Sequence, residues 1–225
     1  MKVVYEDNHI IIVAKESGEI VQGDKTGDTP LSDVVKAYLK EKYQKPGEVF
    51  LGVFHRLDRP VSGLVVFART SKALSRLNRM FAEGEVHKTY WAIVARQVQE
   101  KDTEWHTLTH WLVRNEKQNK SYAYDTEKPN SKKAVLKYRV TRHSDRYSLV
   151  EVQLLTGRHH QIRCQLAKVG MTIKGDLKYG APRSNPDGSI SLLSRRMEFI
   201  HPVSKETIIV EAEVPADNLW QTLQP

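Results

Sequence analysis

The chain has 225 residues, 40% of them hydrophobic, and a formal net charge of +8 at pH 7. This length suits one domain with a proper core, and the basic charge favours a polyanionic partner, most often nucleic acid. The single cysteine, Cys164, excludes a disulfide within the chain and fits a reducing cytoplasm, where we expect the protein to act. The longest aliphatic run, Ile10–Ala14, is far below the roughly 18 apolar residues of a membrane span, so we expect no membrane partner.

The N-terminal part of the chain predicts a hairpin followed by a helix. Val3–Tyr5 and Ile10–Ala14 are apolar and flank Asp7-Asn8, which is typical of two strands joined by a tight turn. The pair Thr29-Pro30 predicts an N-cap with proline at the first helical position. Apolar residues at helical spacing then carry the helix to about Tyr43.

The next stretch places charged residues between two apolar segments, Phe50–Phe54 and Leu64–Ala68, which we expect to be strands. Ser71 is expected to cap a second helix that Gly84 ends. A further strand is predicted at Thr89–Ala95.

The second half of the chain is richer in strands than in helices. A polar segment, Arg114–Lys133, predicts a long exposed loop or hairpin and is the part that we expect to be most mobile. The expected elements beyond it are strands at Ala134–Thr141, Tyr147–Leu155, Leu192–Ile200 and Thr207–Val214, and a helix that starts soon after Gly157 and stops at Gly170. Strands in adjacent pairs predict an α+β fold with a mixed, mostly antiparallel sheet.

Asp58 is the first candidate for chemistry, because it lies between Arg56 and Arg59 in the charged stretch. Nearby positive charge favours an ionised carboxylate, which acts as a nucleophile or an electrostatic stabiliser. The alternative is that Asp58 only pairs with an arginine and braces the loop.

The segment Gly157–Arg163 is the second candidate. It follows a strand and opens a helix, whose first backbone N–H groups favour anions, and it adds Arg158 and Arg163. This arrangement predicts a clamp for a phosphate or a carboxylate, with Asp58 as an obvious partner. A basic first turn without a ligand is the alternative, although it opposes the helix dipole.

Two aromatic or histidine patterns add further candidates. Tyr90 and Trp91 point to opposite faces of their strand, so one ring could stack on a base, or the two could serve core and surface. His106 and His110 have the spacing of a zinc helix, but their setting looks like strand or loop, where they would lie too far apart. We therefore expect no metal site.

Five segments, in this order, resemble the signature motifs of the RluA family of pseudouridine synthases. The family's HRLDxxTSGL, KxY, GRTHQIR, IxGDxxYG and FxHP motifs are matched by His55–Leu64, Lys88–Tyr90, Gly157–Arg163, Ile173–Gly180 and Phe199–Pro202. The resemblance spans most of the chain. Departures from the family pattern are Val61 for Thr, His159 for Thr, Leu193 for His and Glu16 for Pro.

The resemblance implies a mixed, mostly antiparallel sheet with flanking helices and a central RNA-binding cleft. It implies isomerisation of uridine in RNA to pseudouridine, without a cofactor or a metal. Asp58 would be the catalytic aspartate, acting at C1′ directly or by assisting loss of a C2′ proton. Tyr90 would stack on the base, Arg163 would pair with the aspartate, and Arg56 would enter the RNA stack where the uridine leaves.

The family resemblance also bounds the partners. Arg59, Arg158, His160 and Gln161 would contact RNA together with Arg56, and the substrate would be ribosomal or transfer RNA. We expect residues 1–225 to form one catalytic domain that acts as a monomer, without a separate N-terminal RNA-binding domain. The rival hypotheses are a protein that only binds RNA and a metal-dependent hydrolase using His106 and His110.

Overall fold

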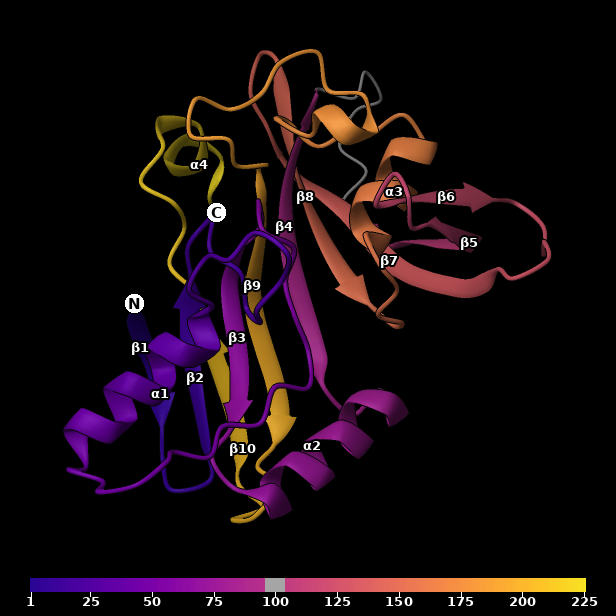
Figure 1. The fold of residues 1–225 in the computed structure, drawn as a ribbon. Coiled ribbons are helices and arrows are strands. Elements are labelled where there is room, and N and C mark those ends of the chain that lie inside the picture. Colours follow the sequence, from indigo (N-terminus) through magenta and orange to yellow (C-terminus); the bar gives the residue numbers. More distant parts are fainter. Residues whose placement is uncertain (96–103) are drawn as a thin grey trace. The chain divides into compact units, whose positions relative to one another are not determined.

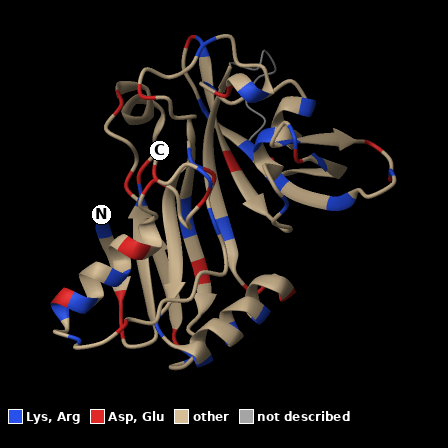
Figure 2. Cartoon of the chain, viewed as in Figure 1, with Lys and Arg blue, Asp and Glu red and all other residues tan. Residues whose placement is uncertain are grey.

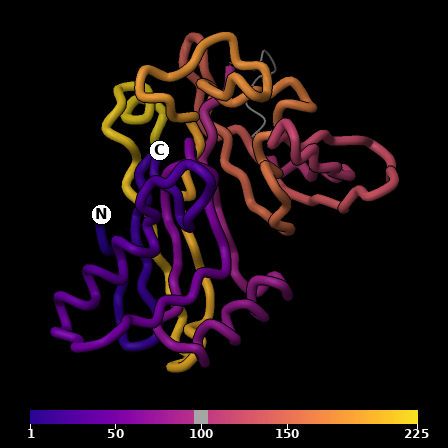
Figure 3. Tube along the Cα trace, in the orientation of Figure 1, coloured from indigo at the N-terminus to yellow at the C-terminus, as the bar shows by residue number. Residues whose placement is uncertain are grey.

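The computed structural model describes residues 1–95 and 104–225, which form two compact units. The first unit comprises residues 1–86 and 196–212, and the second comprises residues 87–195 and 213–225. Figure 3 traces the chain from its indigo N-terminus to its yellow C-terminus. In the described part of the chain, no helix is long and apolar enough to cross a membrane.

The first unit is built on antiparallel strands (Figure 1). The strands are β1 (Lys2–Glu6), β2 (Ile10–Lys15), β3 (Ser62–Ala68), the C-terminal half of β9 (Leu192–Ile200) and β10 (Thr207–Glu211). Strand β2 pairs with β1 and β3, and β10 pairs with β9, all antiparallel. Because the central strands are buried on both faces, β2 and β3 are continuous apolar runs rather than alternating ones.

Two helices complete the first unit, α1 (Leu31–Lys42) and α2 (Ser71–Glu83). Both were predicted, but the cap of α1 lies one residue later than expected and the cap of α2 one residue earlier. Pro30 is itself the N-cap of α1, in extended conformation, and Thr70, not Ser71, caps α2 by accepting a hydrogen bond from the N–H of Ala73. Gly84 ends α2 as predicted, in the left-handed conformation.

The predicted strand at Phe50–Phe54 is wrong. Only Gly52 forms a bridge, exchanging two hydrogen bonds with Ala68 at the end of β3. Strand β3 already has β2 and β9 as neighbours, so only its last residue is available. Gly52 also lies against α2, where a Cβ would come within 2.8 Å of Leu74.

The second unit has five antiparallel strands in the order β4-β8-β7-β5-β6. They are β4 (His87–Ala95), β5 (His106–Asn115), β6 (Lys120–Tyr124), β7 (Lys132–His143) and β8 (Tyr147–Leu154). Its helices are α3 (Gln161–Lys168), the short 3-10 helix η1 (Leu177–Tyr179) and α4 (Asn218–Leu223). The structure thus confirms an α+β fold with a mostly antiparallel sheet.

The polar segment Arg114–Lys133 is a hairpin rather than a structureless loop. Strand β5 continues to Asn115, a short turn follows, and β6 returns antiparallel along it. Strand β5 itself was missed, because its alternation of threonine, histidine and tryptophan carries only weak apolar periodicity. The strand assignments for β4, β7, β8 and β9 and the α3 helix with its stop at Gly170 are confirmed.

Candidate active site

The loop that carries Asp58 belongs to the first unit and follows the Gly52 bridge. His55 fixes the start of this loop, because its Nε2 accepts a 2.9 Å hydrogen bond from the backbone N–H of Val66 in β3. The His55 ring also packs against Phe54 and Phe81. Asp58 is partly buried, and its carbonyl accepts a 3.0 Å hydrogen bond from the N–H of Val61, which closes a turn.

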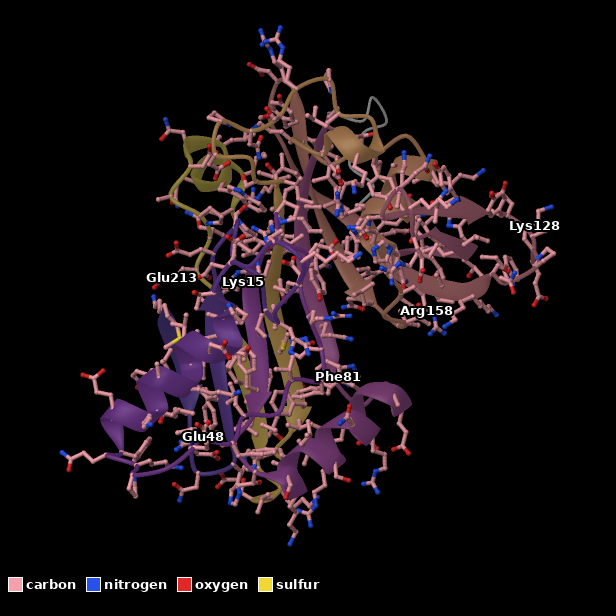
Figure 4. All side chains as sticks on the ribbon, viewed as in Figure 1. Lys15, Glu48, Phe81, Lys128, Arg158 and Glu213 are labelled. Carbon is pink, nitrogen blue, oxygen red and sulfur yellow. The ribbon has the colours of Figure 1, made fainter. Side chains whose placement is uncertain are left out.

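Lys15, at the end of β2, braces the same turn from inside the protein (Figure 4). Its side chain is 2% exposed, and its Nζ donates to the carbonyls of Val61 at 2.6 Å, Glu16 at 2.9 Å and Arg59 at 3.1 Å. Burial lowers the pKa of Lys15 to about 8, against the opposing charges of Glu19 and Asp58. The three fixed carbonyls hold the backbone around Asp58 in place.

The two arginines beside Asp58 have different surroundings. Arg59 is held by the 24–28 loop: its guanidinium donates to Asp28 at 2.6 Å and to Thr26 at 2.8 Å, and lies 3.5 Å from Asp24. Arg56 is exposed and, among the residues that the structure describes, forms no ion pair. Arg56 therefore has its donors available to a ligand, whereas Arg59 already binds two carboxylates.

The Gly157–Arg163 segment belongs to the second unit, and two of its residues are buried. Gln161 is 3% exposed, and its side-chain amide bridges the N–H of Arg158 and the carbonyl of Val135 in β7. His160 has a positive φ of 53°, and its Nδ1 is hydrogen-bonded to the hydroxyl of Tyr179 at 2.9 Å. Burial, with Arg163 beside it, lowers the pKa of His160 to about 2, so the ring is neutral at physiological pH.

Arg163 forms a buried, bidentate ion pair with Asp176. Its Nε lies 2.7 Å from one carboxylate oxygen and its Nη2 lies 2.8 Å from the other. The side chains are 6% and 1% exposed, and the guanidinium also lies 5.2 Å from the ring centroid of Tyr179. This planar pairing fixes the orientation of Arg163.

Gly175 explains why a glycine precedes Asp176. Its φ is +88°, and a Cβ there would come within 2.7 Å of the carbonyl oxygen of Ser189. Only glycine fits this position, so the glycine of the segment Ile173–Gly180 serves to place the carboxylate that binds Arg163.

The structure therefore places the predicted residues in two groups, one in each unit. Arg56, Asp58 and Arg59 share one loop of the first unit. Arg158, His160, Gln161 and Arg163 share one segment of the second unit, where Tyr90 lies on β4 and is 7% exposed. The pairing of Arg163 with Asp58 stays a prediction, and Asp176 is a partner that the structure gives Arg163.

Three residues of these surroundings, Lys15, Asp176 and Tyr179, received no role from the sequence. Asp176 and Tyr179 lie inside the segment that resembles the family motif, so the motif was the available signal. Lys15 had none, because a lysine at the end of an apolar strand ordinarily reads as a strand terminus.

The two histidines considered for a metal lie on strand β5, which is one of the two settings, strand or loop, that the sequence favoured over a helix. His110 is 6% exposed, and its Nδ1 lies 3.0 Å from Nε2 of Gln165, while His106 packs against Tyr138. Over residues 1–95 and 104–225, the structure contains no group of three or more His, Cys, Asp or Glu side chains placed to hold a metal.

Comparison with known proteins identifies the family. The family model described as RNA pseudouridylate synthase matches residues 9–168. The chain belongs to the RluA family of RNA pseudouridine synthases. It is thus an RNA uridine isomerase, and the matched region includes Asp58, Tyr90 and Arg163.

Several relatives of this pseudouridine synthase are similar over almost its whole length. An uncharacterized RNA pseudouridine synthase, YhcT, of Bacillus subtilis is 31% identical over 99% of this chain and 72% of the relative. The tRNA pseudouridine synthase C of Vibrio vulnificus is 31% identical over 99% and 94%. The ribosomal large subunit pseudouridine synthase D of Xanthomonas campestris is 30% identical over 96% and 67%.

The solved structures support the fold. The structure titled Human RNA Pseudouridylate Synthase Domain Containing 4 superposes with a TM-score of 0.77 and 22% identity, over 97% of this chain and 90% of that one. Human RNA Pseudouridylate Synthase Domain Containing 1 gives a TM-score of 0.71 with 23% identity, over 97% and 85%.

We predict that Lys15→Met lowers the free energy of unfolding by about 1–3 kcal/mol at pH 7, because buried backbone carbonyls lose their donor. Between pH 8 and about 10 the unfolded chain keeps a proton that folded Lys15 has lost. The difference in free energy of unfolding between the unsubstituted protein and Lys15→Met should therefore rise as the pH rises over this range. The slope is at most about 1.4 kcal/mol per pH unit. Urea unfolding at several pH values measures both effects. Lys36→Met, at an exposed lysine, is the control, and an equal response of the two variants would contradict the role of Lys15.

We predict that Asp176→Asn lowers the free energy of unfolding by about 3–5 kcal/mol, because it removes the carboxylate that pairs bidentately with the buried guanidinium of Arg163. Glu151→Gln is the matched control: it removes the partner of Arg139 in a half-exposed pair and should cost less than about 1 kcal/mol. Urea unfolding monitored by circular dichroism gives both values. Similar losses of free energy of unfolding in the two variants would show that the Arg163–Asp176 pair stabilises the protein no more than a half-exposed ion pair does.

Proposed function

We propose that this pseudouridine synthase modifies one or a few uridines in ribosomal or transfer RNA. The observation that carries the proposal is the match to the family over residues 9–168, with the aspartate, tyrosine and arginine of the motifs all present. A relative named tRNA pseudouridine synthase C and one named ribosomal large subunit pseudouridine synthase D have nearly equal sequence identity to this chain, 31% and 30%. This supports transfer RNA and ribosomal RNA as candidate substrates.

The proposed reaction begins when the target uridine leaves the RNA stack, which costs a few kcal/mol. The N1–C1′ bond then breaks, the uracil turns, and C5 bonds to C1′; C5 afterwards loses its proton and N1 gains one. Asp58 supplies the carboxylate, either as a nucleophile at C1′ or by assisting loss of a C2′ proton. Stacking on Tyr90, worth about 1–3 kcal/mol, retains the detached base.

The contacts around the arginines refine their proposed roles. Arg56 is exposed, so a planar cation is available to fill the gap that the uridine leaves. Arg163, in its buried pair with Asp176, is a fixed positive charge and serves the proposed pairing with the Asp58 carboxylate. Arg158 is exposed, with its Nε bonded to the carbonyl of Lys133, and is proposed to contact phosphate.

His160 and Gln161 were predicted to bind RNA, and the structure supports an indirect contribution. Both are buried, and both hold the 157–163 segment through Tyr179 and Val135. We propose that they position Arg158 and Arg163. Residues 1–225 are proposed to act as a single catalytic domain, since the family match includes parts of both units. A monomer in the cytoplasm that needs no cofactor completes the proposal.

We predict that Asp58→Asn abolishes pseudouridine formation while the dissociation constant for RNA changes less than about threefold. The amide is nearly isosteric with the carboxylate but carries no charge for the reaction at the sugar. Tritium release from 5-tritiated uridine transcripts measures turnover, and filter binding measures affinity. If RNA affinity fell in proportion to activity, Asp58 would be structural.

We predict that Arg56→Ala lowers kcat/KM at least tenfold with little change in stability, because its exposed guanidinium acts on RNA. Arg59→Ala should affect the protein differently, because Arg59 neutralises Asp24 and Asp28. Its main effect should be faster proteolysis of the 24–28 loop. Steady-state kinetics and limited proteolysis on both variants test these different effects. Equal loss of activity and equal rates of proteolysis in the two variants would contradict the prediction.

Pseudouridine mapping of total RNA tests the proposed function as a whole. RNA from cells that lack the gene is compared with RNA from cells that carry the unaltered gene or Asp58→Asn. Loss of the same uridine modifications in both altered strains identifies the substrate. If neither purified protein nor cells modify any site, the chain only binds RNA.

A further inference from the structure

The β5–β6 hairpin of the second unit has two different faces, because side chains alternate along a strand. Leu112 and Ala123 lie opposite each other and pack with Cys164 of α3 in an apolar cluster. Trp111 and Tyr124 also lie opposite each other, one position along each strand. They therefore point away from α3, to the other face of the hairpin.

The face that points away from α3 is aromatic. Tyr122 and Tyr124 are 39% and 38% exposed, which is high for large rings in a strand, whereas Trp111 is half-buried. Trp111 is directly opposite Tyr124, and Val113 is directly opposite Tyr122, so the side chains are neighbours across the strands. We call Trp111, Tyr122 and Tyr124 the aromatic face.

The surroundings of the aromatic face are basic. Residues 106–143, which include β5, β6 and β7, contain nine Lys or Arg and three Asp or Glu (Figure 2). Lys133 of β7 lies opposite Trp111, and the ammonium of Lys120 lies 5.4 Å from the ring centroid of Tyr122. Exposed rings interleaved with lysines suit stacked bases and their phosphates, whereas protein interfaces are depleted in lysine at their core.

We propose that the aromatic face binds single-stranded nucleotides of the RNA substrate, with bases stacked on the rings and phosphates near Lys120 and Lys133. The inference rests on the proposed function and deepens it, because it assigns a surface that selects the RNA.

The hairpin is also joined to the segment that holds Arg163. Ser121, on the α3 side of β6, donates its N–H to the hydroxyl of Tyr179 at 2.9 Å and its hydroxyl to the carbonyl of His159 at 2.8 Å. The Tyr179 ring packs against the guanidinium of Arg163. Nucleotides on the aromatic face are thus held by an element that is hydrogen-bonded to the support of Arg163.

The test is binding of a fluorescein-labelled, single-stranded oligouridylate of about twelve nucleotides to the full-length protein at fixed salt. The double variant Tyr122→Ala/Tyr124→Ala should bind about tenfold or more weakly, since stacking is lost. Tyr122→Phe/Tyr124→Phe, which keeps both rings, should bind like the unsubstituted protein. Binding of an RNA duplex, which depends on phosphates, should change less than binding of the single strand.

Tyr43→Ala is the matched control in the first unit. Tyr43 is 43% exposed and has the ammonium of Lys42 5.5 Å from its ring centroid, as Tyr122 has that of Lys120. If the double alanine variant binds the single strand as tightly as Tyr43→Ala does, the proposal is overturned and the face serves another partner, such as a protein.

Ultraviolet crosslinking of the unsubstituted protein decides the matter should the double variant not fold. Crosslinked nucleotides on β5 or β6 support the aromatic face, and crosslinks confined to other segments overturn it. Failure of the proposed function has a different signature: the unsubstituted protein would form no pseudouridine, while the loss of single-strand binding in the double alanine variant would persist.

Discussion

The second unit depends on the buried ion pair between Arg163 and Asp176. Removing two charges from water costs several kcal/mol each, and only a close, bidentate arrangement with nothing left unpaired offsets that cost. The pair meets this condition, with both nitrogen–oxygen distances below 2.9 Å. The protein therefore keeps one arginine in a single orientation, which a flexible surface arginine could not do.

Several neighbouring features follow from the need to place this pair. Gly175 allows the backbone to turn with positive φ where any Cβ would collide, and Asp176 comes next in the chain. Tyr179 packs against the guanidinium and accepts a hydrogen bond from the N–H of Ser121 in the hairpin. The family segment Ile173–Gly180 is thus explained by support of one arginine, although none of its residues is proposed to touch the reacting uridine.

The first unit uses a different solution for a buried cation. The Lys15 ammonium donates its hydrogen bonds to three backbone carbonyls around the Asp58 turn rather than to a carboxylate. Carbonyl dipoles satisfy the ammonium without neutralising it, so burial lowers its pKa to about 8. The result is a turn whose backbone is fixed from inside, with Asp58 at its surface.

The sequence predicted the strands and helices whose patterns are local, and failed where tertiary contacts decide. Continuous apolar runs identified β2 and β3 because both faces are buried. Phe50–Phe54 has a similar run but lies where β3 already has two neighbours, which no local pattern reveals. For the candidate site, the motifs indicated Asp58, Tyr90 and Arg163. They did not show that Asp176 binds Arg163, because a contact between two separate segments produces no pattern of spacing in the sequence.

The two arginines beside Asp58 differ in whether a carboxylate of the protein neutralises them. An enzyme for a polyanion needs cations at its surface, and two arginines flank Asp58 in the sequence. Arg59 is neutralised by Asp24 and Asp28 within the first unit. Arg56 keeps its charge exposed and available to RNA. The loop thus carries positive charge beside its carboxylate while fixing Arg59 within the protein, and the exposed Arg56 is the residue that we propose meets an incoming phosphate or unstacked base.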